Sequence, residues 1–283
     1  MSVQIASIQL NSQTNIDANL DIIKRACTEA AVRADVIVLP ENMCVMGRQG
    51  ELALRFDEMV CELSALAKQC GVYILAGTLP CAVRADGTPT TQDKYRQTSL
   101  LFDPQGVQVA RYDKIHLFRA TVDDSTGSYD EGKTFEAGER LVVAPMNIKG
   151  ETVHLGMMIC FDARFPAMAQ RLRQMGADII SVPAAFTYRT GQAHWQLLLQ
   201  ARALDSQCLM IGSAQGGTHR IGTSTRETWG HSMMVDAQGQ IIAHSEQTET
   251  GEQGYLVIYG EFDKAKQTKI RQSMPIFDCH RLG

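Results

Sequence analysis

Short apolar strands alternate with helical patterns along almost the whole chain, and this alternation limits the folds that it can adopt. Strands are expected at about 3–10, 35–39, 72–79, 97–102, 107–111, 141–148, 152–159, 178–182, 208–214, 232–236, 240–243 and 255–258. Helices are expected at about 15–32, 51–69, 166–174, 190–206 and 263–271. Because hairpins and longer crossovers are interleaved, the pattern predicts an α/β fold.

The organisation of the chain indicates a single unit. No repeat, low-complexity tract or linker divides the pattern, so we expect one domain over residues 1–283. Residues 112–140 form the long stretch without clear periodicity. Such a stretch inside a compact domain is usually functional.

Composition and charge narrow the class of protein. Hydrophobic residues make up 45% of the 283 positions and charged residues 20%, as in an ordinary globular protein with a sizeable core. The 27 basic and 31 acidic residues leave a net charge of -4 without a basic stripe, so we expect neither nucleic acid nor a membrane as a partner. No secretory signal or membrane-spanning apolar run is found, which favours a soluble, cytoplasmic protein.

Eight cysteines are scattered along the chain without the spacing of a metal site. None forms a C-x-x-C pair or lies at ligand spacing from a histidine, which argues against zinc and against a disulfide framework. Free thiols in this number fit a reducing compartment.

Three reactive side chains each come just after one of the expected strands: Glu41, Lys114 and Cys160. Active sites of α/β proteins gather at strand ends. Cys160 also lies at a strand-to-helix corner, because Pro166 is typical of a first helical turn. A thiol held there by rigid backbone is close to outward-pointing N–H groups, which suits attack on a carbonyl.

Together these three side chains would be a complete set for acyl transfer. A carboxylate can take the proton of a thiol and later deliver it to departing ammonia, and an ammonium favours first the thiolate and then the oxyanion. Each residue alone has a plainer explanation: a solvated loop acid for Glu41, a surface base for Lys114 and a packed thiol for Cys160. A Cys-His-Asp hydrolase that uses His116 or His194 is an alternative arrangement.

The sequence around these residues resembles a known family. Three segments, PEN (40–42), YDKIHLF (112–118) and CFDARFP (160–166), are similar in this order to the signatures of the nitrilase (carbon–nitrogen hydrolase) superfamily. The resemblance extends from the first strand to Met274-Pro275. It implies a four-layer α-β-β-α sandwich of the nitrilase type, in a homodimer or larger homo-oligomer. It also implies a Glu-Lys-Cys hydrolase that needs no metal and no organic cofactor.

The resemblance also implies a role for each residue. Glu41 would be the general base and acid, Lys114 the cation that stabilises the oxyanion, and Cys160 the nucleophile that forms a thioester. The backbone N–H of Phe161 would be the second oxyanion donor.

Members of the superfamily carry a second glutamate that orients the lysine and the substrate amine. Glu131 best matches its place, and Glu136 and Glu139 are alternatives.

Further segments resemble the Nit branch of the superfamily, which holds omega-amidases and deaminated glutathione amidases. They are PAAF (183–186), TGQAHW (190–195) and ARAL (201–204), while SAQGG (213–217) and WGHSM (229–233) lean towards the deaminated glutathione amidases. The expected reaction is hydrolysis of a small carboxylated amide, foremost deaminated glutathione, with release of ammonia. The alternatives are an omega-amidase acting on 2-oxoglutaramate or succinamate, and a non-catalytic scaffold with the same fold.

A carboxylated substrate requires a cation in its pocket, and Arg164 is the nearest candidate. Arg164 could equally be the buried ion-pair partner of Asp162 or of another acid. Phe186 and Trp195 are expected to line the pocket, although an aromatic residue on a helical pattern, such as Trp195, is more often part of the core. The branch carries Glu where this chain has Ala167, which leaves the choice of substrate open.

Overall fold

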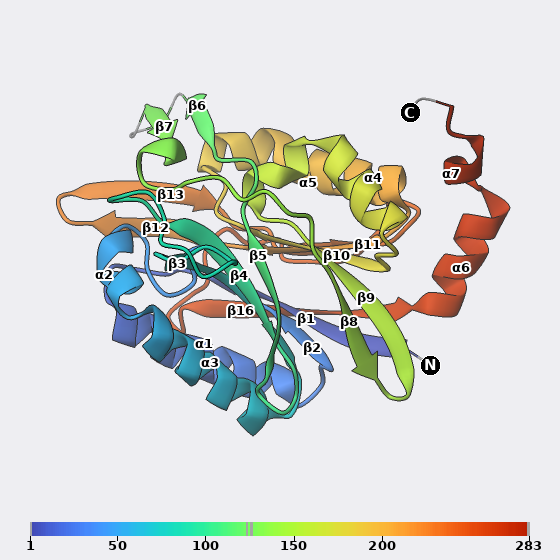
Figure 1. Cartoon of the computed structure of the whole chain (residues 1–283), viewed down its shortest axis with the longest axis horizontal. Helices are drawn as coiled ribbons and strands as arrows, with labels where there is room; N and C mark the ends of the chain where they lie inside the picture. The colour runs from blue at the N-terminus through green and yellow to red at the C-terminus, as the bar shows by residue number, and fades with distance from the viewer. Residues whose placement is uncertain (1, 123, 125–126, 282–283) are drawn as a thin grey trace.

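Two six-stranded β-sheets pack face to face, and helices cover their outer sides (Figure 1). The computed structural model describes residues 2–122, 124 and 127–281. Helices α1 (Ile16–Ala31) and α3 (Phe56–Cys70) cover one sheet, and α4 (Pro166–Gln174) and α5 (Tyr188–Ser206) cover the other. The layers follow the order helix, sheet, sheet, helix, which confirms the α-β-β-α sandwich expected from the sequence.

The first sheet combines strands from both ends of the chain in the order β16-β1-β2-β3-β4-β5. Its strands are β1 (Ser2–Leu10), β2 (Val36–Val38), β3 (Tyr73–Cys81), β4 (Arg96–Phe102), β5 (Gln108–Asp113) and β16 (Tyr255–Asp263). Strands β1, β2 and β3 are parallel. Strand β16 pairs antiparallel with β1, β4 pairs antiparallel with β3, and β5 pairs antiparallel with β4.

The second sheet has the order β15-β14-β11-β10-β9-β8. Its strands are β8 (Val143–Ile148), β9 (Glu151–Met157), β10 (Ile179–Ala184), β11 (Leu209–Ala214), β14 (Met233–Val235) and β15 (Ile241–His244). Strands β9, β10 and β11 are parallel. Each sheet therefore has a parallel centre whose carboxyl ends point the same way, as a site built from strand ends requires.

Alternation along the strands explains how one sheet packs on both faces. Ile5 and Val36 belong to a buried cluster that includes Leu155 of the second sheet. Ile8 and Ile37, on the same strands, belong to a second cluster that includes residues of α1 and α3. Successive side chains of a strand point to opposite faces, so each strand contributes to both clusters.

Polar side chains join the two sheets where β1 and β11 meet. The Ser7 hydroxyl donates to the Gly212 carbonyl at 3.0 Å, and the Ser213 hydroxyl donates to the Val38 carbonyl at 3.0 Å. These buried groups are fully inside the sandwich, where an unpaired hydroxyl would be costly. They therefore fix how the strand ends of one sheet lie relative to those of the other.

The sequence predicts one helix at 51–69, but the structure has two, α2 (Gln49–Leu54) and α3. The break is at Arg55, whose backbone leaves the helical region (φ -106°, ψ 15°). Its guanidinium binds Glu58 in α3 and Asp17 in α1, each at 2.6 Å. The side chain thus ties the break to a neighbouring helix.

Two regions contain short elements that the sequence does not predict. They are β6 (Arg119–Thr121), β7 (Ser128–Asp130) and the 3-10 helix η1 (Glu131–Lys133), and the hairpin of β12 (Gly216–Ile221) and β13 (Ser224–Trp229). Residues 123, 125 and 126 of the first region lie outside the described residues.

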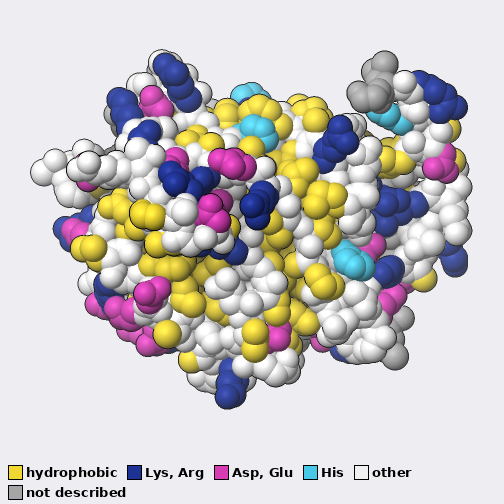
Figure 2. Space-filling model, in the orientation of Figure 1, with side chains coloured by type: hydrophobic (Ala, Val, Ile, Leu, Met, Phe, Trp, Pro, Cys, Tyr) yellow, Lys and Arg dark blue, Asp and Glu magenta, His cyan; other side chains and the backbone are white. Residues whose placement is uncertain are grey.

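The chain ends in α6 (Lys264–Ser273) and α7 (Ile276–Cys279), which stand at one end of the molecule beside the sandwich (Figure 1). Figure 2 shows acidic and basic side chains intermixed over the viewed face, with hydrophobic side chains exposed between them. Within the part of the chain that the structure describes, no helix has both the length and the hydrophobicity needed to cross a membrane.

Candidate active site

Cys160 lies at a sharp corner between β9 and the 3-10 helix η2 (Cys160–Arg164). Its φ of 47° is left-handed, a conformation that residues with a side chain rarely adopt. Asp162 holds the corner, because its buried carboxylate accepts the Ile159 N–H at 2.8 Å and the Tyr112 hydroxyl at 2.7 Å. Strained backbone that is held in place by its surroundings is typical of functional positions.

Glu41 follows β2 and is almost fully buried, with 2% of its surface exposed. The next residue, Asn42, is left-handed (φ 56°), and its N–H donates to the Thr78 hydroxyl at 2.8 Å. The Glu41 carbonyl accepts the Gln215 side-chain amide at 3.0 Å. Because Thr78 belongs to one sheet and Gln215 follows a strand of the other, both sheets fix the direction of this segment.

Lys114 follows β5 and is completely buried. Its Nζ lies 2.8 Å from Oε1 of Glu41, and 3.0 and 2.9 Å from Oε1 and Oε2 of Glu131. Glu131 begins η1, and its Oε2 also accepts the Phe118 N–H at 2.7 Å. A buried ammonium is tolerated only when it is paired, so the two carboxylates hold this cation in one place.

The neighbours of each group set its protonation. Burial alone would lower the pKa of Lys114, but attraction by Glu131 and Glu41 raises that pKa well above its ordinary value. Burial raises the pKa of Cys160 well above its ordinary value, and Glu41 raises it further against the opposing effect of Lys114. Burial also raises the pKa of Glu131. The lysine is therefore charged and the cysteine a neutral thiol at neutral pH, so the thiol needs a base before it can attack.

Glu41, Glu131 and Cys160 line one cavity with about 290 Å³ of empty space, its open mouth included. Lys114 lies behind the two glutamates and supplies the cation between them. The structure thus brings together the four residues that the sequence singles out from separate stretches. Aromatic side chains, among them Phe161, form the apolar walls of the cavity.

Phe161 directly follows the cysteine, and within the described residues its backbone N–H donates to no acceptor. This N–H lies in the first turn of η2, where helical N–H groups have no partner in the helix. A free donor beside the thiol is available for an oxyanion.

Arg164 also lines the cavity, with its guanidinium carbon 5.3 Å from the centre of the Phe186 ring. The alternative ion pair with Asp162 is not formed, since the contacts of that carboxylate are with other groups. Phe186 lines the cavity as expected from the sequence. Trp195 lies behind Phe186, with ring centres 5.0 Å apart, and its indole N–H donates to the His231 carbonyl at 2.8 Å. It supports the wall rather than lining it.

The two alternatives to Glu131 lie elsewhere. Glu136 is 2.7 Å from Arg84 and 2.9 Å from Arg96, and the hydrogen bond from Arg84 lowers its pKa to about 2. Glu139 is exposed at the surface. Of the three glutamates, Glu131 is the one in contact with the buried lysine.

The two histidines of the alternative Cys-His-Asp mechanism contact other side chains and not Cys160. His116 Nδ1 lies 2.8 Å from Asp162, and its ring stacks on Phe165 with centres 3.7 Å apart. His194 is exposed, with Nδ1 3.3 Å from Arg164. Neither is among the residues that line the cavity around Cys160.

Sequence reasoning does not find Arg226, which lines the same cavity from β13. The sequence signal for this hairpin is the turn glycine Gly222, which separates two mostly polar stretches with few β-branched residues. Thr187 and Thr190, at the start of α5, line the cavity as well.

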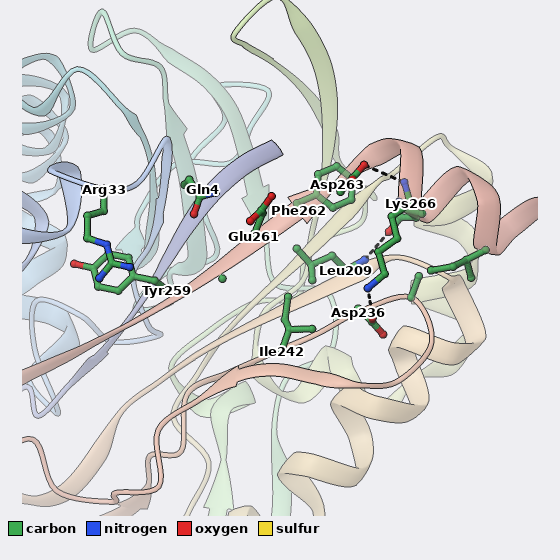
Figure 3. A pocket seen from close by; sticks show the side chains of 14 residues that line it. Gln4, Arg33, Leu209, Asp236, Ile242, Tyr259, Glu261, Phe262, Asp263 and Lys266 are labelled. Atoms are coloured by element: carbon green, nitrogen blue, oxygen red, sulfur yellow. Dashed lines mark hydrogen bonds and ion pairs between the residues drawn. The ribbon is translucent and has the colours of Figure 1, made fainter. Parts of the chain in front are cut away.

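A second and wider opening lies between β16, β15 and α6 (Figure 3). In it Lys266 is 3.2 Å from Asp236, and the guanidinium of Arg33 lies over the ring of Tyr259 at 4.1 Å. Its described lining includes no Cys, Ser or Thr, so it offers neither a thiol nor an aliphatic hydroxyl as a nucleophile. Across residues 2–122, 124 and 127–281, no group of His, Cys, Asp and Glu is arranged to hold a metal ion.

Comparison with known proteins identifies the family. The model of the carbon-nitrogen hydrolase family matches residues 4–272. The chain is 35% identical over 286 residues to the deaminated glutathione amidase of Yersinia enterocolitica, covering 99% of this chain and 94% of that protein. It is 31% identical over 286 residues to the human omega-amidase NIT2, covering 98% and 94%.

A solved structure gives the same result. The Saccharomyces cerevisiae Nit3 protein, a member of branch 10 of the nitrilase superfamily, has a TM-score of 0.77 and 28% identity over 97% of this chain and 94% of that chain. These findings confirm the resemblance read from the three signatures. The chain belongs to the carbon-nitrogen hydrolase family and is an amidase, a hydrolase of C–N bonds other than peptide bonds.

Proposed function

We propose that Glu41, Lys114 and Cys160 hydrolyse a small carboxylated amide through a thioester. The observation that carries the proposal is the buried Lys114 ammonium, which lies within 3.0 Å of both Glu41 and Glu131 beside the cavity that contains Cys160. This arrangement supplies a base, a cation and a nucleophile at one place.

In the first half of the reaction, the Glu41 carboxylate takes the proton of the Cys160 thiol as the sulfur attacks the amide carbon. The raised pKa of Cys160 makes this base necessary. The Lys114 ammonium and the Phe161 N–H stabilise the oxyanion. When the intermediate collapses, the C–N bond breaks, and protonated Glu41 gives its proton to the leaving amine.

In the second half, water attacks the thioester carbon while Glu41 accepts a proton from it. The second tetrahedral intermediate breaks its C–S bond, and the proton returns to the sulfur. The products are a carboxylic acid and the free enzyme. Glu131 keeps Lys114 in place throughout, since both of its oxygens contact Nζ.

The amine product depends on the substrate. A primary amide such as 2-oxoglutaramate or succinamate gives ammonia. In deaminated glutathione the scissile amide joins the oxo-acid to cysteinylglycine, so its amine product is this dipeptide, and the ammonia release expected from the sequence applies to primary amides alone. We place deaminated glutathione first because relatives at 35% and 36% identity bear that name, and Arg164 is available for a carboxylate.

The test is a panel of substrates in which both possible amine products are measured. Wild-type protein is incubated with deaminated glutathione, 2-oxoglutaramate and succinamate, and ammonia and cysteinylglycine are measured to obtain kcat/KM for each. Glu41→Gln should lower kcat by at least about 100-fold, the usual contribution of a general base. Cys160→Ala should abolish turnover and the covalent acyl adduct in intact-protein mass spectra. Near-normal turnover by Glu41→Gln would refute the mechanism, and no turnover of any substrate by wild type would favour the non-catalytic scaffold.

We also propose that the protein forms a homodimer or larger homo-oligomer in the cytoplasm. Leu197 and Leu204 on α5 are 67% and 51% exposed, which suits a face covered by another copy. The exposed thiols of Cys61 and Cys279 suit a reducing compartment.

A further inference from the structure

The cavity around Cys160 holds a second guanidinium besides that of Arg164. Arg226 reaches it from β13, and its Nη2 donates to the Ala185 carbonyl at 2.9 Å. Its guanidinium carbon lies 5.4 Å from the centre of the Tyr129 ring. Its Nε is buried and has no hydrogen-bond acceptor among the described residues. A buried donor without a partner is uncommon in native proteins and needs an explanation.

The net positive charge around the cavity favours an anionic ligand. Three cations at the cavity or just behind its wall (Lys114, Arg164 and Arg226) outnumber the two carboxylates there (Glu41 and Glu131) by one. Both carboxylates are bound to the lysine. Within the described residues, neither arginine forms an ion pair with an acidic side chain. Guanidinium groups bind carboxylates through paired N–H donors, so two of them can receive two carboxylates.

The two arginines come from different elements. Arg164 is on η2, the same short helix that begins with Cys160, and it lies between the rings of Phe161 and Phe186. Arg226 belongs to the hairpin of β12 and β13, much later in the chain, and lines the same cavity. A substrate that contacts both can therefore present a separate carboxylate to each guanidinium.

We propose that Arg226 is a specificity-determining residue that binds a carboxylate on the leaving amine. Arg164 then binds the carboxylate of the acyl half, next to the nucleophile. The substrate class is an N-substituted amide with a carboxylate on each side of the scissile bond, as in an oxo-acid joined to a small peptide. The inference rests on the proposed amidase function and specifies the substrate of that same site.

Arg226 also has a contact that bears on catalysis in general. It binds the carbonyl of Ala185, and the N–H of Ala185 favours the thiolate of Cys160. Replacing Arg226 will therefore disturb the site for every substrate. A test of specificity must compare two substrates on the same variant, so that this common loss cancels.

The experiment uses deaminated glutathione and its C-terminal carboxamide, which differ only in the carboxylate of the leaving amine. For each, kcat/KM is measured with wild type, Arg226→Gln and Arg220→Gln. The last variant is a matched control, because Arg220 lies on the same hairpin but is exposed and does not line the cavity. We expect wild type to favour the free acid by about 10- to 100-fold, as for a hydrogen bond to a charged group.

In Arg226→Gln this preference should fall to near 1, whereas Arg220→Gln should keep the wild-type ratio. Equal kcat/KM values for acid and carboxamide with wild type would overturn the inference without any variant being needed. An undiminished preference in Arg226→Gln would overturn it as well. If wild type hydrolyses neither compound but turns over 2-oxoglutaramate or succinamate, the amidase function stands and this extension is wrong. If it hydrolyses none of these substrates, the proposed function has failed together with the extension. If it hydrolyses both equally, the function stands and the assignment of Arg226 alone is wrong.

Discussion

A single buried carboxylate holds the corner on which Cys160 is mounted. Asp162 is fully buried and accepts the Ile159 N–H, the Tyr112 hydroxyl and the His116 N–H, at 2.8, 2.7 and 3.0 Å. These donors come from the strand before the cysteine and from the segment that carries the buried lysine. One side chain therefore ties two parts of the candidate site together, and networks of this kind are costly to leave partly satisfied.

Asp162→Asn tests this role, because the amide has the shape of the carboxylate but only one acceptor oxygen. Its NH2 group would face a donor, so we expect the free energy of unfolding to fall by about 1–3 kcal/mol. We also expect kcat to fall more than KM rises, since the left-handed corner loses support. Urea denaturation and steady-state kinetics measure both effects. Tyr112→Phe, which removes one donor, is the control and should cost about 1 kcal/mol. An Asn variant as stable and active as wild type would contradict the account.

Among the elements, the sequence predicts long apolar strands well and short polar ones poorly. The strand at 152–159 is almost continuously apolar, and β9 confirms it together with the corner that follows. Strands β6 and β7 have three residues each, too few to show a period. Glu41, Lys114 and Cys160 could thus be predicted, because each follows an apolar strand. Arg226 could not, because it lies within the polar strand β13.

At other positions the residue type is set by packing between strands, which the local sequence pattern does not reveal. A Cβ at Gly77 in β3 would lie 1.8 Å from the Pro40 carbonyl oxygen and 2.5 Å from that of Leu39. Gly77 lies where the pairing of β3 with β4 shifts register, between Ala76 and Leu79. The strand therefore approaches the segment before Glu41 too closely for any side chain.

Gly77→Ala should move the Pro40 carbonyl and, with it, the Glu41 carboxylate. We expect the free energy of unfolding to fall by at least about 2 kcal/mol, as for overpacking, and kcat to fall by about 10- to 100-fold from the displaced base. Thermal unfolding and kinetics measure the two effects. The matched control is Gly50→Ala in α2, where the Cβ would meet the Tyr95 hydroxyl at 3.2 Å and the change should stay within about 1 kcal/mol. If both variants behave alike, the close approach does not matter.

For the molecule as a whole, a buried histidine joins the hairpin that carries Arg226 to the rest of the sandwich. His219 Nδ1 lies 2.7 Å from the Ser12 carbonyl, and Nε2 lies 2.6 Å from the Thr228 hydroxyl. The Ser12 hydroxyl donates to the Met43 carbonyl, two residues after Glu41. The hairpin, the loop after β1 and the segment of the candidate base are therefore linked through buried hydrogen bonds.

This link makes stability depend on pH in a direction that can be worked out. Burial lowers the pKa of His219 from 6.5 to about 4, although the Ser12 carbonyl opposes the shift. Below pH 6.5 the unfolded chain binds a proton at this residue while the folded chain does not. The contribution of His219 to stability is therefore complete above pH 6.5 and is lost as the pH falls towards 4.

Between pH 7.5 and 5 this one group should remove about 2 kcal/mol from the free energy of unfolding. Urea titrations of wild type and His219→Gln at both pH values isolate the contribution of the histidine to the free energy of unfolding. Glutamine offers a donor and an acceptor but cannot become charged. Wild type should lose about 2 kcal/mol more than the variant over this range. If both proteins lose the same amount, the histidine is not buried as a neutral ring. Since the hairpin holds Arg226 against Ala185, acid should also weaken selectivity for a substrate with two carboxylates before it unfolds the chain.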